Sequence, residues 1–248
     1  MHADVQAGRY GEPSTTIFDD LRGLSDVRAI PTGFSHRDAE ELILTTGAEH
    51  ASKLKTAIVV PPCIYGTGRG PGNQRSMQIP ELVRCTLEKG HGITVGRGKN
   101  VWSGVHVQDL SALYLTLVEN AAAGESLAEW AGKPALWGEA GLFFCESGEE
   151  VRWDEVAGVV VEEAKKAGFL GKEAGVREVG KEEAAELTHR GDVLWGCNSR
   201  SKALRAREAL GWEAKAAGVR EVVREQIGIE AQRLGMRVGH AKVAAGDA

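Results

Sequence analysis

The chain has 248 residues, with 30 lysines and arginines against 35 aspartates and glutamates, so its formal net charge is -5. This length is enough to bury a sizeable core, and the acidic balance argues against a nucleic-acid-binding surface, which is normally basic. No apolar run approaches the roughly 18 residues that a membrane span needs, so we expect neither nucleic acid nor membrane as a partner.

The first quarter of the chain predicts a surface connection, a helix and a buried strand. Residues 1–33 are rich in turn-forming residues and predict a long connection with one short element near Ile17–Leu24. Residues 36–50 predict a helix lying on a sheet, because apolar residues recur there at helical spacing. These residues are Ala39, Leu42, Ile43 and Ala48. Thr56–Val60 is apolar on both faces, which predicts a central, buried parallel strand.

The middle of the chain predicts a loop followed by alternating helices and strands. A glycine-rich loop at residues 66–74 leads into a helix predicted over Ile79–Lys89, which ends at Gly90. Two short strands, a second helix and a loop are predicted next: Ile93–Val95, Val105–Val107, Leu110–Ala122 and Gly124–Pro134. We expect Asp109 to be the N-cap of the second helix.

The last part of the chain predicts one more strand and four helices. Leu142–Cys145 is a short apolar strand, and Trp153–Gly168 has the spacing of an amphipathic helix. Three further helices are predicted over Lys181–His189, Ser201–Leu210 and Val219–Leu234. Residues 236–248 are unpatterned and predict a frayed tail. Because strands alternate with helices, the sequence predicts an α/β fold with a mainly parallel sheet.

The cysteines and histidines give no sign of a metal site or a disulfide framework. Cys63, Cys85, Cys145 and Cys197 form no CxxC pair, and the seven histidines form no HExxH pair. We therefore expect lone buried thiols in a reducing compartment and no metal. The first four residues lack a charged segment followed by an apolar one, so no signal peptide is expected.

The glycine-rich loop was tested against two phosphate-binding motifs. Gly66 and Gly68 give GxG, but the third glycine of GxGxxG falls on Pro71, and no GKS or GKT is present for a P-loop. Two interpretations of the loop stay open, a flexible active-site loop and a plain long turn. The chain also contains no GxSxG, which disfavours an α/β-hydrolase.

Four segments together resemble a known family. Thr56–Gly66 reads TAIVVPPCIYG and is similar to the strand and turn that typically read "vvRPxxiYG" in extended short-chain dehydrogenases/reductases, the NAD-dependent epimerase/dehydratase group. Three more segments match in the family's order: Tyr10–Pro13 ("VYGeP"), Val105–Leu110 ("vHVdDla") and Ser201–Trp212 ("skar–eLGW"). Each match is weak alone, but the four cover nearly the whole chain and are most similar to the fungal branch of the family.

The resemblance implies a fold and a division of the chain. The fold expected is the C-terminal portion of a Rossmann-type parallel sheet with an interleaved small α/β substrate lobe. Residues 1–65 and about 105–147 would form the sheet core. Residues of about 66–104 and 148–235 would form the lobe, all within a single incomplete NAD(P)-binding domain.

The resemblance also implies a function and site residues. It implies a cytoplasmic NAD(P)-dependent oxidoreductase or epimerase that acts on a small carbonyl or hydroxyl compound, with NAD or NADP as cofactor. The cofactor would lie against four residues, Pro61, Pro62, Cys63 and Ile64. The substrate would lie near Tyr65, Arg69 and Trp102. A small-molecule substrate is the partner expected, and a homodimer is left open.

Three departures from the family pattern qualify this expectation. Only nine residues precede Tyr10, and a βαβ unit with the family's GxxGxxG needs about 30, so we expect a truncated chain that binds NAD(P)H weakly. No register gives the family's Tyr-x-x-x-Lys pair, which leaves Arg37 as a weak catalytic candidate. Trp102 stands where nucleotide-sugar enzymes of the family often have an arginine, which favours a smaller or more apolar ligand.

The sequence therefore supports two hypotheses for this chain. The first is an NAD(P)-dependent oxidoreductase or epimerase-like protein that is weak or inactive in this form. The alternative is a non-catalytic binding or regulatory protein derived from the same fold.

Overall fold

Parallel strand pairs flanked by helices make up most of the chain. The computed structural model describes residues 2–31, 36–123 and 134–237. The helices are α1 (His2–Ala7), α2 (Leu24–Arg28), α3 (Arg37–Glu49), α4 (Gln78–Lys89), α5 (Val107–Ala123), the 3-10 helix η1 (Gly138–Ala140), α6 (Trp153–Lys166), α7 (Lys181–Leu187), α8 (Gly191–Gly196), α9 (Leu204–Leu210) and α10 (Val219–Arg233). The strands are β1 (Phe18–Asp19), β2 (Ile58–Val60), β3 (Cys63–Tyr65), β4 (Gly92–Val95), β5 (Val101–His106), β6 (Leu142–Phe144), β7 (Glu150–Arg152), β8 (Val176–Val179) and β9 (Ser201–Lys202).

The strands pair mostly in parallel, which confirms the α/β class predicted from the sequence. β2 runs parallel to β6, β3 to β5, β4 to β8 and β1 to β9. Only β7 pairs antiparallel, against the first half of β5, among the described strands. Parallel pairs need long crossover connections, and the helices between the strands supply them.

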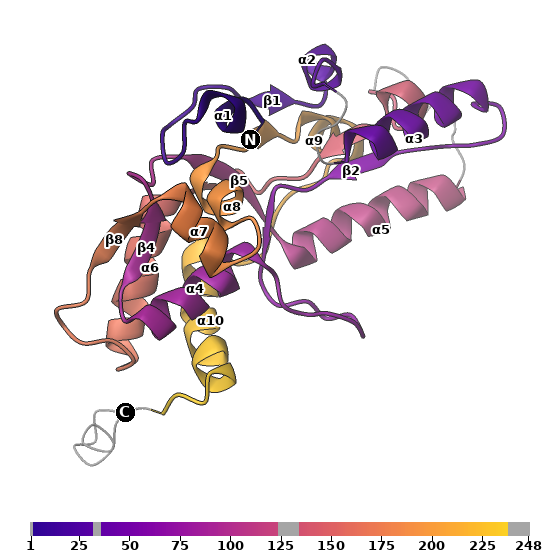
Figure 1. The fold of residues 1–248 in the computed structure, drawn as a ribbon. Coiled ribbons are helices and arrows are strands. Elements are labelled where there is room, and N and C mark those ends of the chain that lie inside the picture. The colour runs from indigo at the N-terminus through magenta and orange to yellow at the C-terminus, as the bar shows by residue number, and fades with distance from the viewer. Residues whose placement is uncertain (1, 32–35, 124–133, 238–248) are drawn as a thin grey trace.

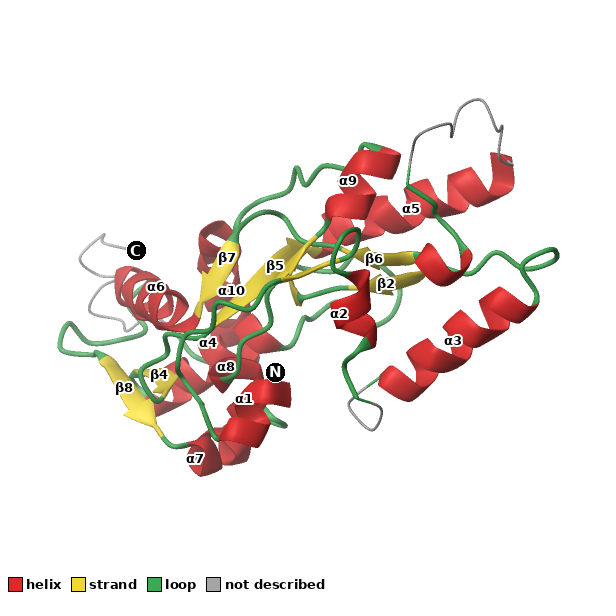
Figure 2. Cartoon of the chain, turned by 90° about the horizontal axis from the view of Figure 1, so that it is seen from above, coloured by secondary structure: helices red, strands yellow, loops and turns green. Residues whose placement is uncertain are grey.

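The described residues form two hydrophobic clusters, and Figures 1 and 2 label the helices and strands that carry them. One is built by α4, α6 and α10 around β4, with Trp153 and Trp195 among its fully buried side chains. The other is built by β6, α5 and α9, with Phe143 at its centre. Strand β5 serves both, since Trp102 belongs to the first cluster and Val105 to the second. Because β5 contributes buried residues to both clusters, it fixes the position of one cluster relative to the other.

The long helices lie where the apolar spacing predicts them. α3, α4, α6 and α10 start and end within two residues of the predicted bounds. Gly90 and Gly211 follow α4 and α9 in the left-handed conformation, with φ of 75° and 64°. Glycine adopts this conformation without the steric cost that a Cβ would add, so it ends a helix cleanly.

Several short elements differ from the prediction. Ser201 and Lys202 are not helical but form β9, because their backbone pairs with Phe18 and Asp19. α1, α8, β7 and β8 lie in segments for which no element is predicted. These elements are too short to show a hydrophobic period, so contacts far along the chain determine them.

Asp109 is not the N-cap that the sequence predicts. Helix α5 begins two residues earlier, at Val107, and Asp109 is buried in its first turn. Its carboxylate accepts hydrogen bonds from the backbone N–H groups of Lys215 and Ala216. Asp109 therefore holds the segment before α10 and does not cap its own helix.

The β2 strand is less buried than the sequence predicts. Thr56–Val60 was expected to be central, but the residues of β2 are only half-buried, and β2 pairs only with β6 among the described strands. The predicted sheet-facing residues of α3 are also exposed, since Leu42 is 67% and Ile43 38% accessible. On α5, Tyr114, Leu115 and Val118 are exposed too. Helices α3 and α5 therefore expose apolar side chains to solvent beside the half-buried strand β2.

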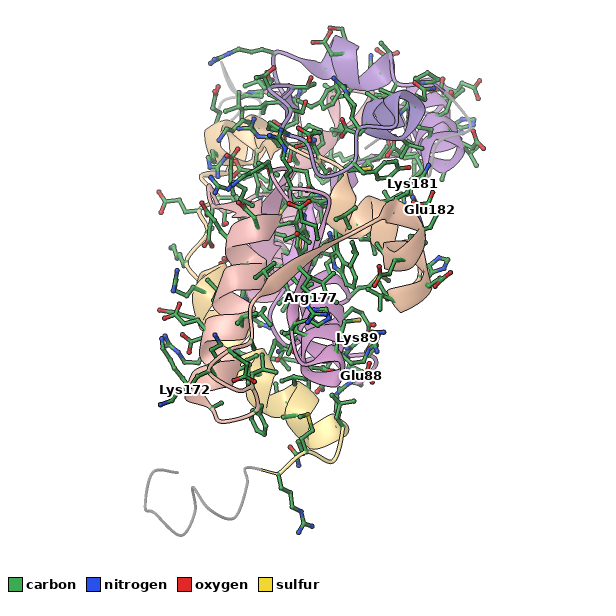
Figure 3. All side chains as sticks on the ribbon, turned by 60° about the vertical axis from the view of Figure 1, so that its left-hand side comes forward. Glu88, Lys89, Lys172, Arg177, Lys181 and Glu182 are labelled. Carbon is green, nitrogen blue, oxygen red and sulfur yellow. The ribbon has the colours of Figure 1, made fainter. Side chains whose placement is uncertain are left out.

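The surface around β8 is charged and solvated. Figure 3 shows the side chains of six such residues spread over α4, α7, β8 and the loop that precedes β8, all of them exposed. They are Glu88, Lys89, Lys172, Arg177, Lys181 and Glu182. Glu88 pairs with Arg84 and Glu182 with Lys181, so this face has the mixed charge of an ordinary solvent surface.

Candidate functional site

A cavity of about 310 Å³ opens where β3 ends, between the glycine-rich loop and the first turn of α4. Its lining comes from β3 and the turn after it, from the second half of the loop, and from the start of α5. The lining residues are Pro62, Ile64, Gly66, Gly68, Asn73, Gln74, Arg75, Ser76, Met77, Gln78 and Val107. In α/β folds ligands sit beyond the carboxyl ends of parallel strands, and this cavity lies at such an end.

The turn after β3 requires a glycine at position 66. Gly66 has φ of 86°, in the left-handed region. A Cβ built on it would lie 2.3 Å from Nε2 of His106, which is closer than any real contact. The His106 ring in turn packs edge-on against Tyr65 at 5.7 Å between ring centroids. The sequence thus places a glycine where β3 must turn into the cavity wall.

The glycine-rich loop closes on itself through short hydrogen bonds. The Gly68 N–H donates to the carbonyl of Gln74 at 2.8 Å, and the Gln74 side chain donates to the carbonyl of Gly70 at 2.9 Å. Asn73 exchanges hydrogen bonds with the backbone of Arg75. The loop therefore has a defined shape, and the amide groups of Asn73 and Gln74 are used within it.

Both ends of the loop are attached to α10. At the first end, the Thr67 hydroxyl donates to Glu225 at 3.2 Å and accepts from the Gln226 amide at 3.3 Å. At the second end, Arg75 donates two hydrogen bonds to Glu230 at 2.8 and 3.0 Å. The partners are about one turn apart on α10, so one helix holds both ends of the loop.

Arg75 is the charged residue of the cavity wall, and its charge is paired twice. Besides Glu230, its guanidinium donates to Glu81 at 2.5 Å. The hydrogen bond to Glu230 raises the pKa of Arg75 above its usual value. Burial raises the pKa of Glu81, but hydrogen bonds from Arg84 and Arg75 outweigh burial and leave it below its usual value. Arg75 and Glu81 are therefore ionised at neutral pH.

The amino end of α4 forms the floor of the cavity. Gln78 is buried there, its side chain donates to the carbonyl of Leu194, and its own carbonyl accepts from the Trp195 indole. Met77 is 53% exposed and borders the opening. These contacts fix the floor to α8 and leave Met77 free to contact a ligand.

Two of the four predicted cofactor residues reach the cavity. Pro62 and Ile64 line it, whereas Pro61 is half-buried away from the lining. Cys63 is fully buried in the first cluster, and burial raises the pKa of its thiol to about 12. Alternation along β3 explains the split, since successive side chains point to opposite faces of a strand.

Tyr65 and Trp102 are core residues and do not line the cavity. Tyr65 is 1% exposed, and its hydroxyl contacts Glu149 at 3.4 Å. Burial raises the pKa of Tyr65 to about 12. Trp102 is 5% exposed, and its indole donates to the carbonyl of Cys197 at 2.7 Å. Their buried hydrogen bonds account for both side chains without a substrate.

The other two candidates lie outside the cavity as well. Arg69 is exposed on the loop and is not part of the lining. Arg37 is buried at the start of α3, where it donates to the carbonyls of Arg28 and Ile30 and pairs with Glu40 at 2.6 Å. These bonds join α2 to α3. The segment from Gly33 to Ser35, in which the family's tyrosine was sought, lies outside the described residues.

Sequence reasoning missed several lining residues. Arg75, Met77 and Gln78 line the cavity but belong to no motif described above, and Val107 lies in the motif Val105–Leu110 without being predicted as a site residue. The first three follow the glycine-rich loop closely, and Val107 ends the "vHV" segment; these positions are the signals in the sequence that point to them. The described residues contain no cluster of histidine, cysteine and carboxylate side chains suited to a metal. None of the described helices has both the length and the hydropathy to cross a membrane.

The cavity fits part of a dinucleotide. Pro62 and Ile64 give it apolar surface at a strand end, which suits a nicotinamide ring. A pyrophosphate normally rests on the backbone N–H groups of a GxxGxxG turn, and the described residues contain no such turn. The cavity therefore suits a nicotinamide ring with a compact ligand beside it.

Comparison with known proteins gives one family and consistent folds. The profile of the "NAD dependent epimerase/dehydratase family" matches residues 31–130. A curated protein, "Oxidase ucsJ" of Acremonium sp, is 33% identical over 236 residues, which cover 95% of this chain and 67% of that protein.

Solved structures in this comparison share the fold at low identity. UDP-glucose 4-epimerase of Thermotoga maritima, solved with UDP-glucose, has a TM-score of 0.55 and 18% identity over 92% of this chain and 62% of its own. UDP-glucuronic acid 4-epimerase of Bacillus cereus, solved with UDP-glucuronic acid and NAD, has a TM-score of 0.52 and 12% identity over 79% and 51%. The chain thus spans between half and two thirds of the length of these three proteins.

Proposed function

Because the chain belongs to the NAD-dependent epimerase/dehydratase family, we propose that it acts as an NAD(P)-dependent oxidoreductase or epimerase-like protein on a small carbonyl or hydroxyl compound. The observation that carries this proposal is the cavity at the end of β3. It has the strand-end position at which such folds bind ligands, and Pro62 and Ile64 line it. The curated relative is named an oxidase, which agrees with redox chemistry.

In this proposal the two hydrophobic clusters correspond to two parts of one domain. The cluster around Phe143 belongs to the sheet core, and the cluster of α4, α6 and α10 belongs to the substrate lobe. The cavity lies between α4 and the ends of β3, where the two parts meet. Pro62 and Ile64 would lie against a nicotinamide, which would supply hydride transfer, and the part of the cavity beside the start of α4 would hold the substrate.

We propose that turnover by this chain is slow. The family's Tyr-x-x-x-Lys pair is absent from the sequence, and Tyr65 has a pKa of about 12 and no access to the cavity. A phenol with a raised pKa cannot exchange protons readily at neutral pH. The missing general acid typically accounts for about 10²–10⁴-fold in rate. Water has to supply the proton in its place.

The experiment is steady-state reduction of small carbonyl compounds with NADH or NADPH. We expect slow, saturable turnover that Ile64→Trp abolishes by filling the cavity, while Ile93→Val, a change in the core away from it, leaves turnover within about twofold. Cofactor affinity is measured separately by nicotinamide fluorescence. We expect a Kd above about 10 μM, because the described residues contain no glycine-rich turn that could hold a pyrophosphate.

Arg37 gives an independent control on the catalytic assignment. Since its hydrogen bonds join α2 to α3, Arg37→Ala is expected to lower turnover less than about tenfold. A loss of about 10³-fold, in a variant that remains folded, would instead show that Arg37 is a catalytic residue.

A second candidate function is a non-catalytic binding or regulatory protein. Two observations favour it. Tyr65 is buried away from the cavity, and no described residue of the cavity lining carries a phenol, imidazole or carboxylate. Ligand binding without any cofactor oxidation, for every carbonyl compound and both cofactors, would support this candidate over the first.

A further inference from the structure

The positive charge in the cavity wall is neutralised by two carboxylates that do not line the cavity. Of the described residues that line the cavity, only Arg75 carries a charge. Its three nitrogens donate to two carboxylates, with Nε and Nη2 bonded to Glu230 and Nη1 bonded to Glu81. Three of the five N–H donors of the guanidinium are therefore used, and its positive charge faces two carboxylates, which weakens its attraction for a ligand anion.

Burial makes this cancellation strong. The Glu230 side chain is 2% exposed, and those of Arg75 and Glu81 are 19% and 16% exposed. Charges so far from bulk water interact more strongly than exposed ion pairs do. Bidentate pairing with Glu230 also fixes the orientation of the Arg75 guanidinium, because turning it toward the cavity would leave the buried Glu230 carboxylate to the longer ion pair with Arg233, at 3.9 Å.

The helix that forms the floor is neutralised in the same way. The amino end of α4 borders the cavity, and a helix amino end normally attracts anions. Here Pro80 removes one of the free N–H groups of the first turn, and the Glu81 carboxylate adds a negative charge to that turn. Glu81 therefore opposes the positive potential of the helix end and of Arg75, and it shares its charge with Arg84, which also donates hydrogen bonds to it.

The rest of the wall is uncharged. Pro62, Ile64, Met77 and Val107 supply hydrophobic surface, and Asn73, Gln74, Ser76 and Gln78 are polar without a charge. The volume of about 310 Å³ lies at the lower end of the range for small-molecule pockets, about 300–1,000 Å³. The site thus offers apolar contacts and uncharged polar groups to a compact molecule.

We propose that this cavity selects an uncharged, mainly apolar ligand and excludes anions, and that Glu230 and Glu81 determine this specificity by cancelling the charge of Arg75. The proposal rests on the proposed function in taking the cavity as the substrate site. It separates this chain from the solved epimerases reported above, whose structures hold UDP-sugars. Glu230 and Glu81 act through Arg75 and contact no ligand themselves.

The test compares two probes of similar size that differ in charge, acetophenone and benzoate. Binding to the whole chain is measured by ligand-observed NMR without any cofactor, in the wild type and in Glu230→Gln. The substitution keeps the shape of the side chain and one hydrogen-bond acceptor but removes the charge that cancels Arg75. Glu81→Gln is measured in parallel, because Glu81 is partly exposed and its loss threatens folding less.

The matched control is Glu88→Gln. It removes the same charge from α4, but Glu88 pairs with Arg84 on the exposed surface and makes no contact with Arg75. Any change in benzoate binding that reflects net charge alone appears in this control as well. Ile64→Trp, which fills the cavity, checks that acetophenone binds there.

We expect the wild type to bind acetophenone at least about tenfold more tightly than benzoate. Glu230→Gln and Glu81→Gln should raise benzoate affinity about tenfold, as a hydrogen bond to a charged group typically contributes, while Glu88→Gln leaves it unchanged. Equal or tighter binding of benzoate by the wild type, no binding of either probe, or unchanged benzoate affinity in both folded variants would overturn the inference. Lack of turnover with NAD(P)H would count against the proposed function only, because these measurements contain no cofactor.

Discussion

The guanidinium of Arg75 and the carboxylate of Glu230 form two parallel hydrogen bonds, 2.8 and 3.0 Å long, between residues 155 positions apart. Glu230 is 1% exposed, so this pair lies inside the protein. It attaches the end of the glycine-rich loop to α10, and with Thr67 it sets the shape of the cavity wall. The C-terminal helix therefore supports a site formed by residues of the first half of the chain.

Removing one partner of this pair should destabilise the fold. We expect Arg75→Met to lower the free energy of unfolding by up to about 3–5 kcal/mol, because it removes two hydrogen bonds from the buried Glu230 carboxylate and leaves it the longer ion pair with Arg233, at 3.9 Å. The double variant Arg75→Met/Glu230→Leu should lose less free energy of unfolding than the single variant, since position 230 then carries no buried charge. Urea unfolding measures both, and equal losses would show that the pairing contributes little.

The turn at Gly66 should not tolerate a side chain. Gly66→Ala adds a Cβ next to His106 Nε2 and places an L-residue in the left-handed region, which alone costs about 1–2 kcal/mol. Gly72→Ala is the control, because a Cβ there meets nothing within 4 Å. We expect the first variant to be less stable and to bind acetophenone more weakly, and the control to stay within about 0.5 kcal/mol of the wild type. Thermal unfolding and the NMR titration measure the two effects.

Stability should fall at acid pH partly through Glu81. Its pKa in the folded chain lies below the usual 4.5, so its pairing with Arg84 and Arg75 stabilises the fold above about pH 4.5 and is lost as pH falls through the lower folded value. The stability difference between the wild type and Glu81→Gln should therefore be full at pH 7 and shrink below pH 4.5. Glu88→Gln, whose ion pair is exposed, should show a smaller difference at every pH. A difference for Glu81→Gln that does not change between pH 7 and pH 3 would contradict this assignment.

Trp102 should behave as a core residue and not as a ligand contact. Trp102→Phe loses the hydrogen bond to the Cys197 carbonyl, worth about 1 kcal/mol, and should leave acetophenone affinity within about twofold. Trp102→Arg, which restores the residue type of the nucleotide-sugar enzymes, buries an unpaired charge and should cost more than about 3 kcal/mol. A folded Trp102→Arg variant that binds UDP-glucose would show that this position faces the site.

The open apolar surface on α3 and α5 should promote self-association. Leu42 on α3 and Leu115 and Val118 on α5 are exposed, and β2 has no described partner beyond β6. We expect oligomers of the isolated chain in sedimentation velocity, and a shift toward monomer in the variant Leu42→Lys/Leu115→Lys/Val118→Glu. Val176→Lys, on the exposed end of β8, is the control and should not change the distribution. A monodisperse wild-type monomer with a cooperative thermal transition would rule this prediction out.

The sequence by itself determined the parts that depend on local pattern. Apolar residues at helical spacing place α4, α6 and α10, and left-handed glycines end α4 and α9, because the backbone needs only neighbouring residues to make these choices. The motif TAIVVPPCIYG and three further segments indicate the family, and they place the cavity wall at Pro62 and Ile64.

Only the tertiary structure decided how the site is charged and which candidates reach it. Trp102, Tyr65 and Arg37 have residue types suited to a site, yet each is buried by partners far away or on another element. Arg75 belongs to no motif of the sequence, and the neutralisation of its charge depends on Glu230, 155 residues later. Local spacing carries no information on such pairings, because burial and charge cancellation depend on which distant segments the fold brings into contact.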